Sequence, residues 1–282
     1  MPTLEELGGW SAVLGALTAA RDIGADQAGA AMDEILAGAA TSAQIAGFIV
    51  SLRMKGETVD ELAGLLAAMR RASEPVVLSD LDGVVDVVGT GGDRSHTINV
   101  STLAALVVAG AGGRVCKHGN RAASSACGSA DVLEALGVTV DLGPEGVARC
   151  VDEAGIGFCF APRFHPAMRH AVTTRRELGV PTVFNFLGPL ANPAGVRRQL
   201  IGVSDPAMAA RMIGVLAARG ADRVLVVYGH DGLDELTTTT TSTVLDFDGE
   251  SVTRYDVDPT TLGLARCEPH QLRGGDAATN AA

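Results

Sequence analysis

The chain of 282 residues is long enough for one or two domains, and its 47% hydrophobic residues, 35 glycines and 4% aromatics indicate an α/β protein. Its net charge of −11 argues against a general binder of nucleic acid or of a membrane surface. The N-terminus has no basic segment and the longest apolar run, residues 103–113, is too short to cross a bilayer, so we expect neither a secretory signal nor a membrane span.

The first 73 residues have the periodicity of helices throughout. Trp10–Ala20 and Ala25–Leu36 are rich in Ala and Leu at helical spacing. Two more helices are expected after Thr41 and Thr58, because each hydroxyl is followed three residues later by Gln or Glu, as in a capping box. The helix Ser42–Lys55 is apolar on almost every side, which predicts a dimer interface, with packing into the core of the same chain as the alternative.

A strand, a glycine-rich loop and a helix start follow one another in residues 84–102. Val84–Val88 is an apolar run interrupted only by Asp86, which favours a buried strand. The loop Gly89–Asp93 (GTGGD) lets the backbone approach a ligand closely, and the helix expected at Ser101–Gly110 starts with free N–H groups and hydroxyls. This arrangement predicts an anion site, with an ordinary strand-to-helix turn as the alternative.

Strand-like and helix-like segments alternate in the rest of the chain. Strands are expected at 114–117, 138–141, 157–161, 182–186 and 223–228, and helices at 130–136, 144–154, 165–178 and 206–219. This rhythm predicts a mainly parallel sheet with helices on both faces. After Thr243 the pattern indicates an antiparallel addition, and the run Thr237–Thr241 reads as an extended polar loop.

The second strand-to-helix junction, Lys117–Ser125 (KHGNRAASS), concentrates two cations, a histidine, an amide and two hydroxyls. Such a cluster in an acidic chain favours an anionic ligand over a solvated basic loop. Ligands of open α/β sheets bind beyond the carboxyl ends of the strands, so this loop and GTGGD can converge on one substrate with more than one phosphate.

Two further features carry charge. The turn Asp231–Glu235 (DGLDE) offers adjacent carboxylates that suit Mg²⁺ together with substrate phosphates, or else forms an acidic surface turn. Arg175 and Arg176 lie on an expected helix, where one of them could grip a substrate carboxylate in a bidentate fork; a surface pair fits equally well.

With these motifs in this order, the sequence resembles the anthranilate phosphoribosyltransferases, enzymes of tryptophan biosynthesis. The resemblance covers nearly the whole chain, including residues 160–171 (FAPRFHPAMRHA) and 179–194 (GVPTVFNFLGPLANPA). It implies a small all-helical domain, residues 1–73, that forms a homodimer, and an α/β domain, residues 74–282, of the nucleoside phosphorylase and phosphoribosyltransferase type. The family's C-terminal helical segment would open near residue 282, so we expect this chain to lack it.

The resemblance also implies phosphoribosyl pyrophosphate and anthranilate as substrates and Mg²⁺ as cofactor. By motif, the substrate-binding residues would be Gly89, Gly92, Asp93, Thr97, Asn99, Ser101, Thr102, Lys117, His118, Gly119, Asn120, Arg121, Ala122, Ala123, Ser124, Ser125, Ser129 and Arg175. Ser101, Asp234 and Glu235 would bind Mg²⁺, and Arg175 would face the anthranilate carboxylate. Catalysis is expected to be electrostatic, with Lys117 and Arg175 as the candidate catalytic residues.

Three other functions compete with this one. A pyrimidine nucleoside phosphorylase would need only one phosphate, and a non-catalytic nucleic-acid-binding relative would need a basic surface without the DGLDE carboxylates. A shortened, inactive form of the transferase is the third. The five cysteines are scattered without a CxxC pair, which predicts a reduced, cytoplasmic protein without a zinc site.

Overall fold

The computed structural model describes residues 2–122 and 126–282, which form two compact units. The first unit comprises Met1–Glu74 together with Phe164–Ala191, and the second comprises Pro75–Arg163 together with Asn192–Ala282. The sequence pattern predicts a single division after residue 73 and gives no sign that a later segment belongs with the N-terminal helices. No helix among the described residues has the length and apolarity needed to span a membrane.

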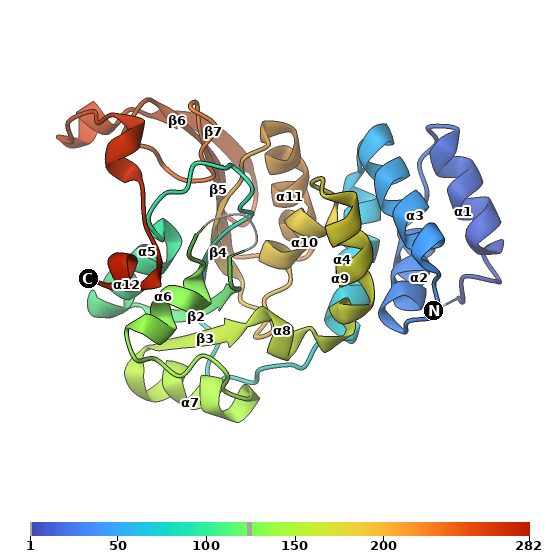
Figure 1. Ribbon diagram of the computed structural model, residues 1–282, viewed down its shortest axis with the longest axis horizontal. Coiled ribbons are helices and arrows are strands. Elements are labelled where there is room, and N and C mark those ends of the chain that lie inside the picture. The colour runs from blue at the N-terminus through green and yellow to red at the C-terminus, as the bar shows by residue number, and fades with distance from the viewer. Residues whose placement is uncertain (1, 123–125) are drawn as a thin grey trace. The chain divides into compact units, whose positions relative to one another are not determined.

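The first unit is all-helical. It contains α1 (Gly9–Thr18), α2 (Ala25–Leu36), α3 (Ser42–Lys55), α4 (Val59–Arg71), the 3₁₀ helix η1 (Pro166–Met168), α9 (Arg169–Leu178) and α10 (Phe184–Leu190) (Figure 1). Both predicted capping boxes are present: the side chains of Thr41 and Thr58 accept from the backbone N–H groups of Gln44 and Glu61. The core is built from large apolar side chains that are fully buried, among them Phe48, Leu52, Leu62, Leu65 and Leu66.

Of the expectations for residues 165–190, the strand is wrong and the helix is confirmed except at its start. The strand expected at Thr182–Phe186 does not form; α10 begins at Phe184, with the Asn185 side chain accepting from the Thr182 N–H at 3.0 Å. A short apolar run that is buried all round shows no periodicity that separates helix from strand. The single helix expected from His165 is instead η1 followed by α9.

The second unit is built on one sheet of seven strands in the order β3-β2-β1-β4-β5-β6-β7. These are β1 (Val84–Gly89), β2 (Arg114–Gly119), β3 (Ile156–Phe160), β4 (Arg198–Gly202), β5 (Arg223–Gly229), β6 (Ser242–Phe247) and β7 (Val252–Val257). The first five strands are parallel and β6 and β7 are antiparallel, which confirms the mainly parallel sheet and its antiparallel addition.

Helices cover both faces of this sheet, as expected from the alternating pattern. Those of the second unit are α5 (Val100–Gly110), α6 (Ser129–Ala135), α7 (Pro144–Ala154), α11 (Pro206–Ala218) and α12 (Ala277–Ala281), with 3₁₀ helices η2 (Pro259–Leu262) and η3 (Pro269–Leu272). In Figure 1, α5 and α11 lie on opposite sides of the strands. The four-residue α8 (Ala161–Phe164) lies where the chain leaves this unit.

Two differences from the expected strands concern the sheet. Residues 138–141 form no strand; Val140 instead packs against Ala130, Leu133 and Phe158. The strand β4, at 198–202, is absent from the expectations because its first half is polar. Its Gln199 is nevertheless buried, and it lies beside Asp86 of β1 in the parallel register.

Candidate active site

The two predicted anion loops and the predicted Mg²⁺ turn lie at strands whose carboxyl ends share one edge of the sheet. GTGGD begins with the last residue of β1, KHGNRAASS begins within β2, and DGLDE follows β5. Strand β1 lies between β2 and β4, so the chain connections diverge on its two sides. In an open α/β sheet this switch point is where the crevice for a ligand forms.

DGLDE lies directly over the ends of β1 and β4. The backbone N–H of Gly91 donates to Asp234 Oδ2 at 2.6 Å, and the Thr90 N–H donates to the Gly202 carbonyl at 2.9 Å. A Cβ atom placed on Gly202 would lie 1.6 Å from the Asp234 carbonyl oxygen, and one on Gly89 would lie 2.6 Å from Asp234 Oδ2. Only glycine therefore lets the acidic turn approach the two strands this closely.

Three carboxylates gather where these loops meet. Asp234 is 7% exposed; burial, followed by the charge of Asp93, raises its pKa to about 6. Glu235 is half-buried, and this burial, followed by the charges of Asp234 and Asp93, raises its pKa to about 8. The Ser101 backbone N–H, at the start of α5, hydrogen-bonds to Glu235 and opposes this shift. Close carboxylates that resist ionisation together favour a cation between them.

These side chains fit Mg²⁺, which takes oxygen ligands from one or two carboxylates and completes its shell with water and substrate phosphates. In the described part of the chain, no three His, Cys, Asp or Glu side chains are arranged to hold a metal ion by themselves. A magnesium ion here would therefore depend on the substrate for part of its coordination.

Lys117 is the cation that faces this acidic cluster. Its side chain is 2% exposed; Nζ donates to the Val87 carbonyl at 2.5 Å and to Ser101 Oγ at 3.1 Å. Burial lowers its pKa, while the charges of Asp86 and Glu235 act in the opposite direction. Lys117 thus links β1, β2 and the start of α5 at a single point.

Asp86, in β1, is fully buried within the sheet. Its carboxylate accepts from the His118 backbone N–H at 3.0 Å and from Asn192 Nδ2 at 2.8 Å, and burial raises its pKa to about 6. Asn192 also donates to the Cys116 carbonyl at 2.9 Å. The sequence showed Asp86 as the one charge in an apolar strand, but the site prediction does not include it.

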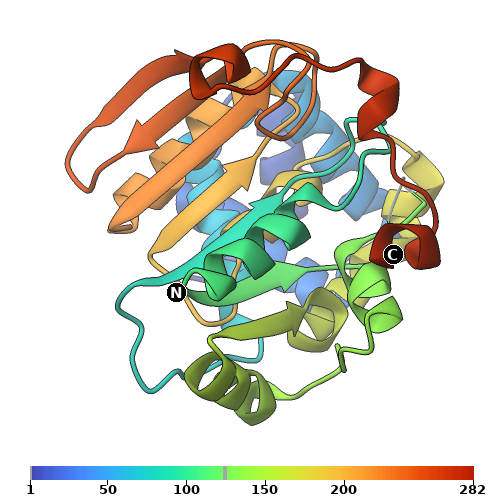
Figure 2. The same cartoon turned by 90° about the vertical axis from the view of Figure 1, so that its left-hand side faces the viewer.

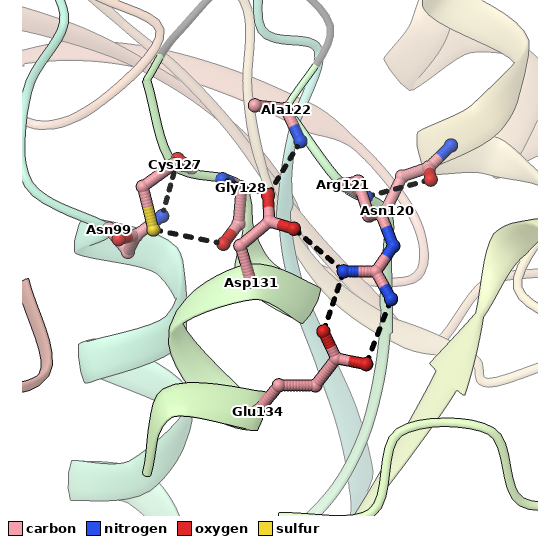
Figure 3. Close-up of polar contacts among 8 residues, drawn as sticks. All are labelled: Asn99, Asn120, Arg121, Ala122, Cys127, Gly128, Asp131 and Glu134. Atoms are coloured by element: carbon pink, nitrogen blue, oxygen red, sulfur yellow. Dashed lines mark hydrogen bonds and ion pairs between the residues drawn. The ribbon is translucent and has the colours of Figure 1, made fainter. Parts of the chain in front are cut away.

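The junction after β2 is held by α6, as Figure 3 shows. The guanidinium of Arg121 pairs with Asp131 at 2.8 Å and with both oxygens of Glu134, at 2.6 and 2.8 Å. It also lies over the Phe160 ring, 5.4 Å from the centroid. Arg121, expected among the substrate-binding residues, is therefore paired with two carboxylates of α6. The expected residues Ala123, Ser124 and Ser125 lie outside the described residues.

The loop between β1 and α5 is paired with a distant segment of the chain. Thr97 forms an antiparallel bridge with Arg273, the Ile98 N–H donates to the Leu272 carbonyl at 3.0 Å, and Asn280 Nδ2 donates to Asn99 Oδ1 at 2.9 Å. Gly91 and Gly92 have φ angles of 66° and 84°, and Arg94 and His96 share this left-handed region. The C-terminal residues thus hold a loop in which several residues have positive φ angles. Their helix α12 lies beside α6 (Figure 2).

The other expected residues of this unit have distinct positions. Asn99 does not cap α5 with its side chain but donates to the Cys127 carbonyl at 3.0 Å. Thr102 and His118 are buried. Gly119, the last residue of β2, lies close to Ser129 at the start of α6, because a Cβ atom on Gly119 would be 3.2 Å from the Ser129 Cβ. The backbone carbonyl of Asn120 accepts from the Ala130 N–H at 3.1 Å.

Arg175 belongs to the helical unit. It is half-buried on α9, its guanidinium lies 5.4 Å from the centroid of the Phe184 ring, and burial lowers its pKa. A planar guanidinium supported by an aromatic ring retains its outer N–H groups for a carboxylate. That Arg175 acts at the same site as the other predicted residues stays a prediction.

The threonine run after DGLDE has a structural role that the sequence did not reveal. Asp231 accepts from Thr237 Oγ1 at 2.7 Å and also from Thr239 Oγ1, and its second oxygen accepts from the Leu233 N–H at 3.2 Å. The run is a loop, as expected, but its hydroxyls fix the first residue of the acidic turn. Asp231 is therefore occupied, which leaves Asp234 and Glu235 as the carboxylates of DGLDE that face the site.

Comparisons with known proteins identify relatives over almost the whole chain. Residues 81–282 match a family model described as the a/b domain of a glycosyl transferase family, and residues 11–73 match the helical bundle domain of that family. The chain is 59% identical over 273 residues to anthranilate phosphoribosyltransferase of Rhodococcus jostii (strain RHA1), covering 97% of this chain and 75% of the relative.

Solved structures agree with these relatives. A crystal structure of anthranilate phosphoribosyltransferase from Thermus thermophilus matches with a TM-score of 0.88 at 43% identity, covering 95% of this chain and 80% of that one. Anthranilate phosphoribosyltransferase from Saccharomyces cerevisiae, in complex with PRPP and Mg, also matches with a TM-score of 0.88, at 29% identity and covering 99% and 80% of the two chains.

Proposed function

The chain belongs to the anthranilate phosphoribosyltransferase family, and we propose which role each of its site residues has in the reaction. The enzyme transfers the phosphoribosyl group of phosphoribosyl pyrophosphate to the amine of anthranilate, releasing pyrophosphate, in tryptophan biosynthesis. The nucleoside phosphorylase, the nucleic-acid-binding relative and the inactive form are not favoured by these relatives. The convergence of three loops around Lys117, Asp234 and Glu235 is the observation that carries the assignment of roles.

The reaction places opposite charges on the two halves of the donor substrate. Breaking the bond from C1 of the ribose to pyrophosphate builds positive charge on the sugar and negative charge on the leaving group. Lys117, the loop N–H groups and the start of α5 would stabilise the leaving group electrostatically, and losing one such preorganised donor typically costs about 10²–10³ in rate. The amine of anthranilate is neutral at pH 7 and carries a free lone pair, so the attack needs no strong base.

Asp234, Glu235 and Ser101 are the residues that would hold Mg²⁺. Their oxygens suit this ion, and burial, followed by the charges of the neighbouring carboxylates, raises the pKa values of Asp234 and Glu235, an effect that a bound cation would oppose. Held there with the substrate, Mg²⁺ would supply positive charge that offsets the negative charge of the pyrophosphate. The Mg-bound yeast relative supports this assignment, which is our proposal for the present chain.

Arg175 is proposed to face the anthranilate carboxylate. Its guanidinium is held over Phe184, and Arg binds a carboxylate through two parallel N–H bonds. Together with Lys117 it forms the pair of candidate catalytic residues; no covalent intermediate with the protein is proposed. An Arg175→Lys variant would keep the charge but lose the fork, and we expect the KM for anthranilate to rise more than the KM for phosphoribosyl pyrophosphate.

The helical unit is proposed to form a homodimer, with residues 1–73 as its main part. Helix α3 exposes Met54 (84%), beside an apolar groove of about 330 Å³ lined by Val50, Arg53, Met54, Val180, Pro181 and Thr182. Sedimentation of the wild-type chain and of a Met54→Glu variant tests this: we expect a dimer for the first and a monomer for the second. We also propose a cytoplasmic location, where the five free thiols remain reduced.

The assay for the function follows the loss of anthranilate fluorescence after addition of phosphoribosyl pyrophosphate. We expect a loss that requires Mg²⁺ and stops with EDTA. If the folded protein shows no loss at any Mg²⁺ concentration, the transferase activity proposed for this chain is wrong and the inactive or binding form is favoured. The same assay with inorganic phosphate and a pyrimidine nucleoside tests the phosphorylase directly.

A further inference from the structure

Asp131, on the first turn of α6, holds both ends of the segment that follows Arg121. Its Oδ2 atom accepts from the Ala122 N–H at 3.1 Å and from the Gly128 N–H at 2.8 Å (Figure 3). Reaching back to the residue before the helix is ordinary for a capping side chain, but the bond to Ala122 is not part of a cap. One oxygen thus joins Ala122, shortly after β2 ends at Gly119, to Gly128, the residue before α6.

The two ends of the loop also touch directly. A Cβ atom on Gly128 would lie 2.2 Å from the Ala122 nitrogen and 2.4 Å from the Arg121 carbonyl carbon, so only glycine fits there. The Ala130 N–H donates to the Asn120 carbonyl at 3.1 Å, which closes the base from the other side. Ala122 and Gly128 are therefore held close together, and this approach depends on the glycine at 128 and on one carboxylate.

The second oxygen of Asp131 has a separate task. Oδ1 accepts from Arg121 Nη1 at 2.8 Å, and the same guanidinium is also held by Glu134. The hydrogen bonds from the two loop ends lower the pKa of Asp131, with the Arg121 pair adding to this effect. Asp131 thus has a loop-closing oxygen and an ion-pairing oxygen, and suitable substitutions can separate the two.

We propose that Asp131 is a positioning residue for phosphoribosyl pyrophosphate, acting through the backbone N–H groups of Ala122 and Gly128. It does not contact the reacting atoms; it fixes the positions at which Asn120 and Ser129, on either side of the closed base, present their polar groups. This inference rests on the proposed function, because it assumes that Asn120 and Ser129 bind the pyrophosphate donor.

Three variants separate the tasks. Asp131→Ala removes both. Asp131→Asn can keep its carbonyl on the two backbone N–H groups; its amide NH2 then faces a guanidinium donor, so only the ion pair and hydrogen bond to Arg121 are lost. Glu134→Gln also weakens the hold on Arg121 and removes one charge, but it leaves Ala122 and Gly128 untouched. Glu134 is the matched control because it lies outside the predicted substrate-binding residues.

The readout is the dissociation constant of phosphoribosyl pyrophosphate in the presence of Mg²⁺, by calorimetry, together with kcat and both KM values. We expect Asp131→Ala to weaken binding of this substrate on the order of tenfold, with the KM for anthranilate changed by less than about threefold. Asp131→Asn and Glu134→Gln should stay within about threefold of wild type for both substrates. This pattern of rescue by asparagine distinguishes loop closure from ion pairing.

A second variant reaches the same loop without touching the carboxylate. Gly128→Ala forces the two loop ends apart and should reproduce the weakened binding of Asp131→Ala; it carries the test if Asp131→Ala does not fold, as judged by circular dichroism. The proposal is overturned if the folded variants bind phosphoribosyl pyrophosphate as the wild type does, or if Asp131→Asn and Glu134→Gln are impaired as strongly as Asp131→Ala. A wild-type chain that binds the substrate without turnover would contradict the proposed function but leave this binding comparison valid.

Discussion

Replacing Gly202 with alanine tests the geometry of the site most directly. The new Cβ would lie 1.6 Å from the Asp234 carbonyl oxygen, whereas contacts under 3.0 Å essentially do not occur, so one of the two must move by about 1.4 Å. Gly202 ends β4, which is paired with β1 on one side and β5 on the other, and its carbonyl accepts from Thr90. The strand cannot yield, so we expect the acidic turn to move.

This displacement would shift Asp234 and Glu235 away from GTGGD. A misplacement of about 1 Å typically costs on the order of 10² in rate, which corresponds to about 2.7 kcal/mol in the activation free energy. Overpacking typically costs about 1–3 kcal/mol of stability, and in a chain of this size each kcal/mol lowers Tm by roughly 2–4 °C. We therefore expect a folded enzyme with a lower Tm and a kcat/KM reduced on the order of 10²-fold.

The measurement combines steady-state kinetics, a Mg²⁺ titration of activity and thermal unfolding. Gly110→Ala is the matched control, because nothing lies within 4 Å of a Cβ at this position in α5 and alanine suits a helix; its kinetics should equal those of the wild type. If Gly202→Ala keeps kcat and the Mg²⁺ dependence within about twofold of wild type, the close approach of the acidic turn does not matter for catalysis.

Three other outcomes are expected. Asp234→Asn and Glu235→Gln should each lower kcat and weaken the dependence on Mg²⁺, as shown by activity against Mg²⁺ concentration; near-wild-type kinetics would remove these residues from the metal site. Because burial raises the pKa of Asp86 to about 6, the folded protein retains a proton that the unfolded chain releases near pH 4, so this residue makes stability fall as pH rises from about 4 to 6. When the free energy of unfolding is measured with urea at several pH values, Asp86→Asn should show a smaller decrease between pH 4 and 6 than the wild type. An equal decrease in both proteins would contradict the raised pKa of Asp86. At pH 7, Asp86→Asn should cost roughly 1–3 kcal/mol, because Asn192 and the His118 N–H each need an acceptor.

Much of the fold could be read from local patterns. The capping boxes at Thr41 and Thr58, the strand interrupted by Asp86 and the glycine loop after it all report their structure within a few residues. The errors occur where tertiary packing decides: residues 182–186 are apolar enough for either a helix or a strand, and β4 is concealed by a polar start whose Gln199 is buried beside Asp86.

The candidate site divides in the same way. The motifs located the loops, but the contacts that hold them come from residues without a motif, such as Asp131, Asn192 and Thr237. A single sequence contains no signal that Thr237 restrains Asp231 or that Asn192 reaches Asp86 across 106 positions. Only the fold brings such residues together, so their roles had to wait for the structure.

The pairing of Thr97 with Arg273 and of Asn99 with Asn280 bears on how the protein is made. Asn99 and Asn280 are 181 residues apart, so a nascent chain must extend almost to Ala282 before the loop between β1 and α5 meets its partner segment. Contacts of such long range form late, because the entropy of closing the intervening chain must be lost first. During synthesis the sheet can thus assemble before its binding loop acquires a fixed path.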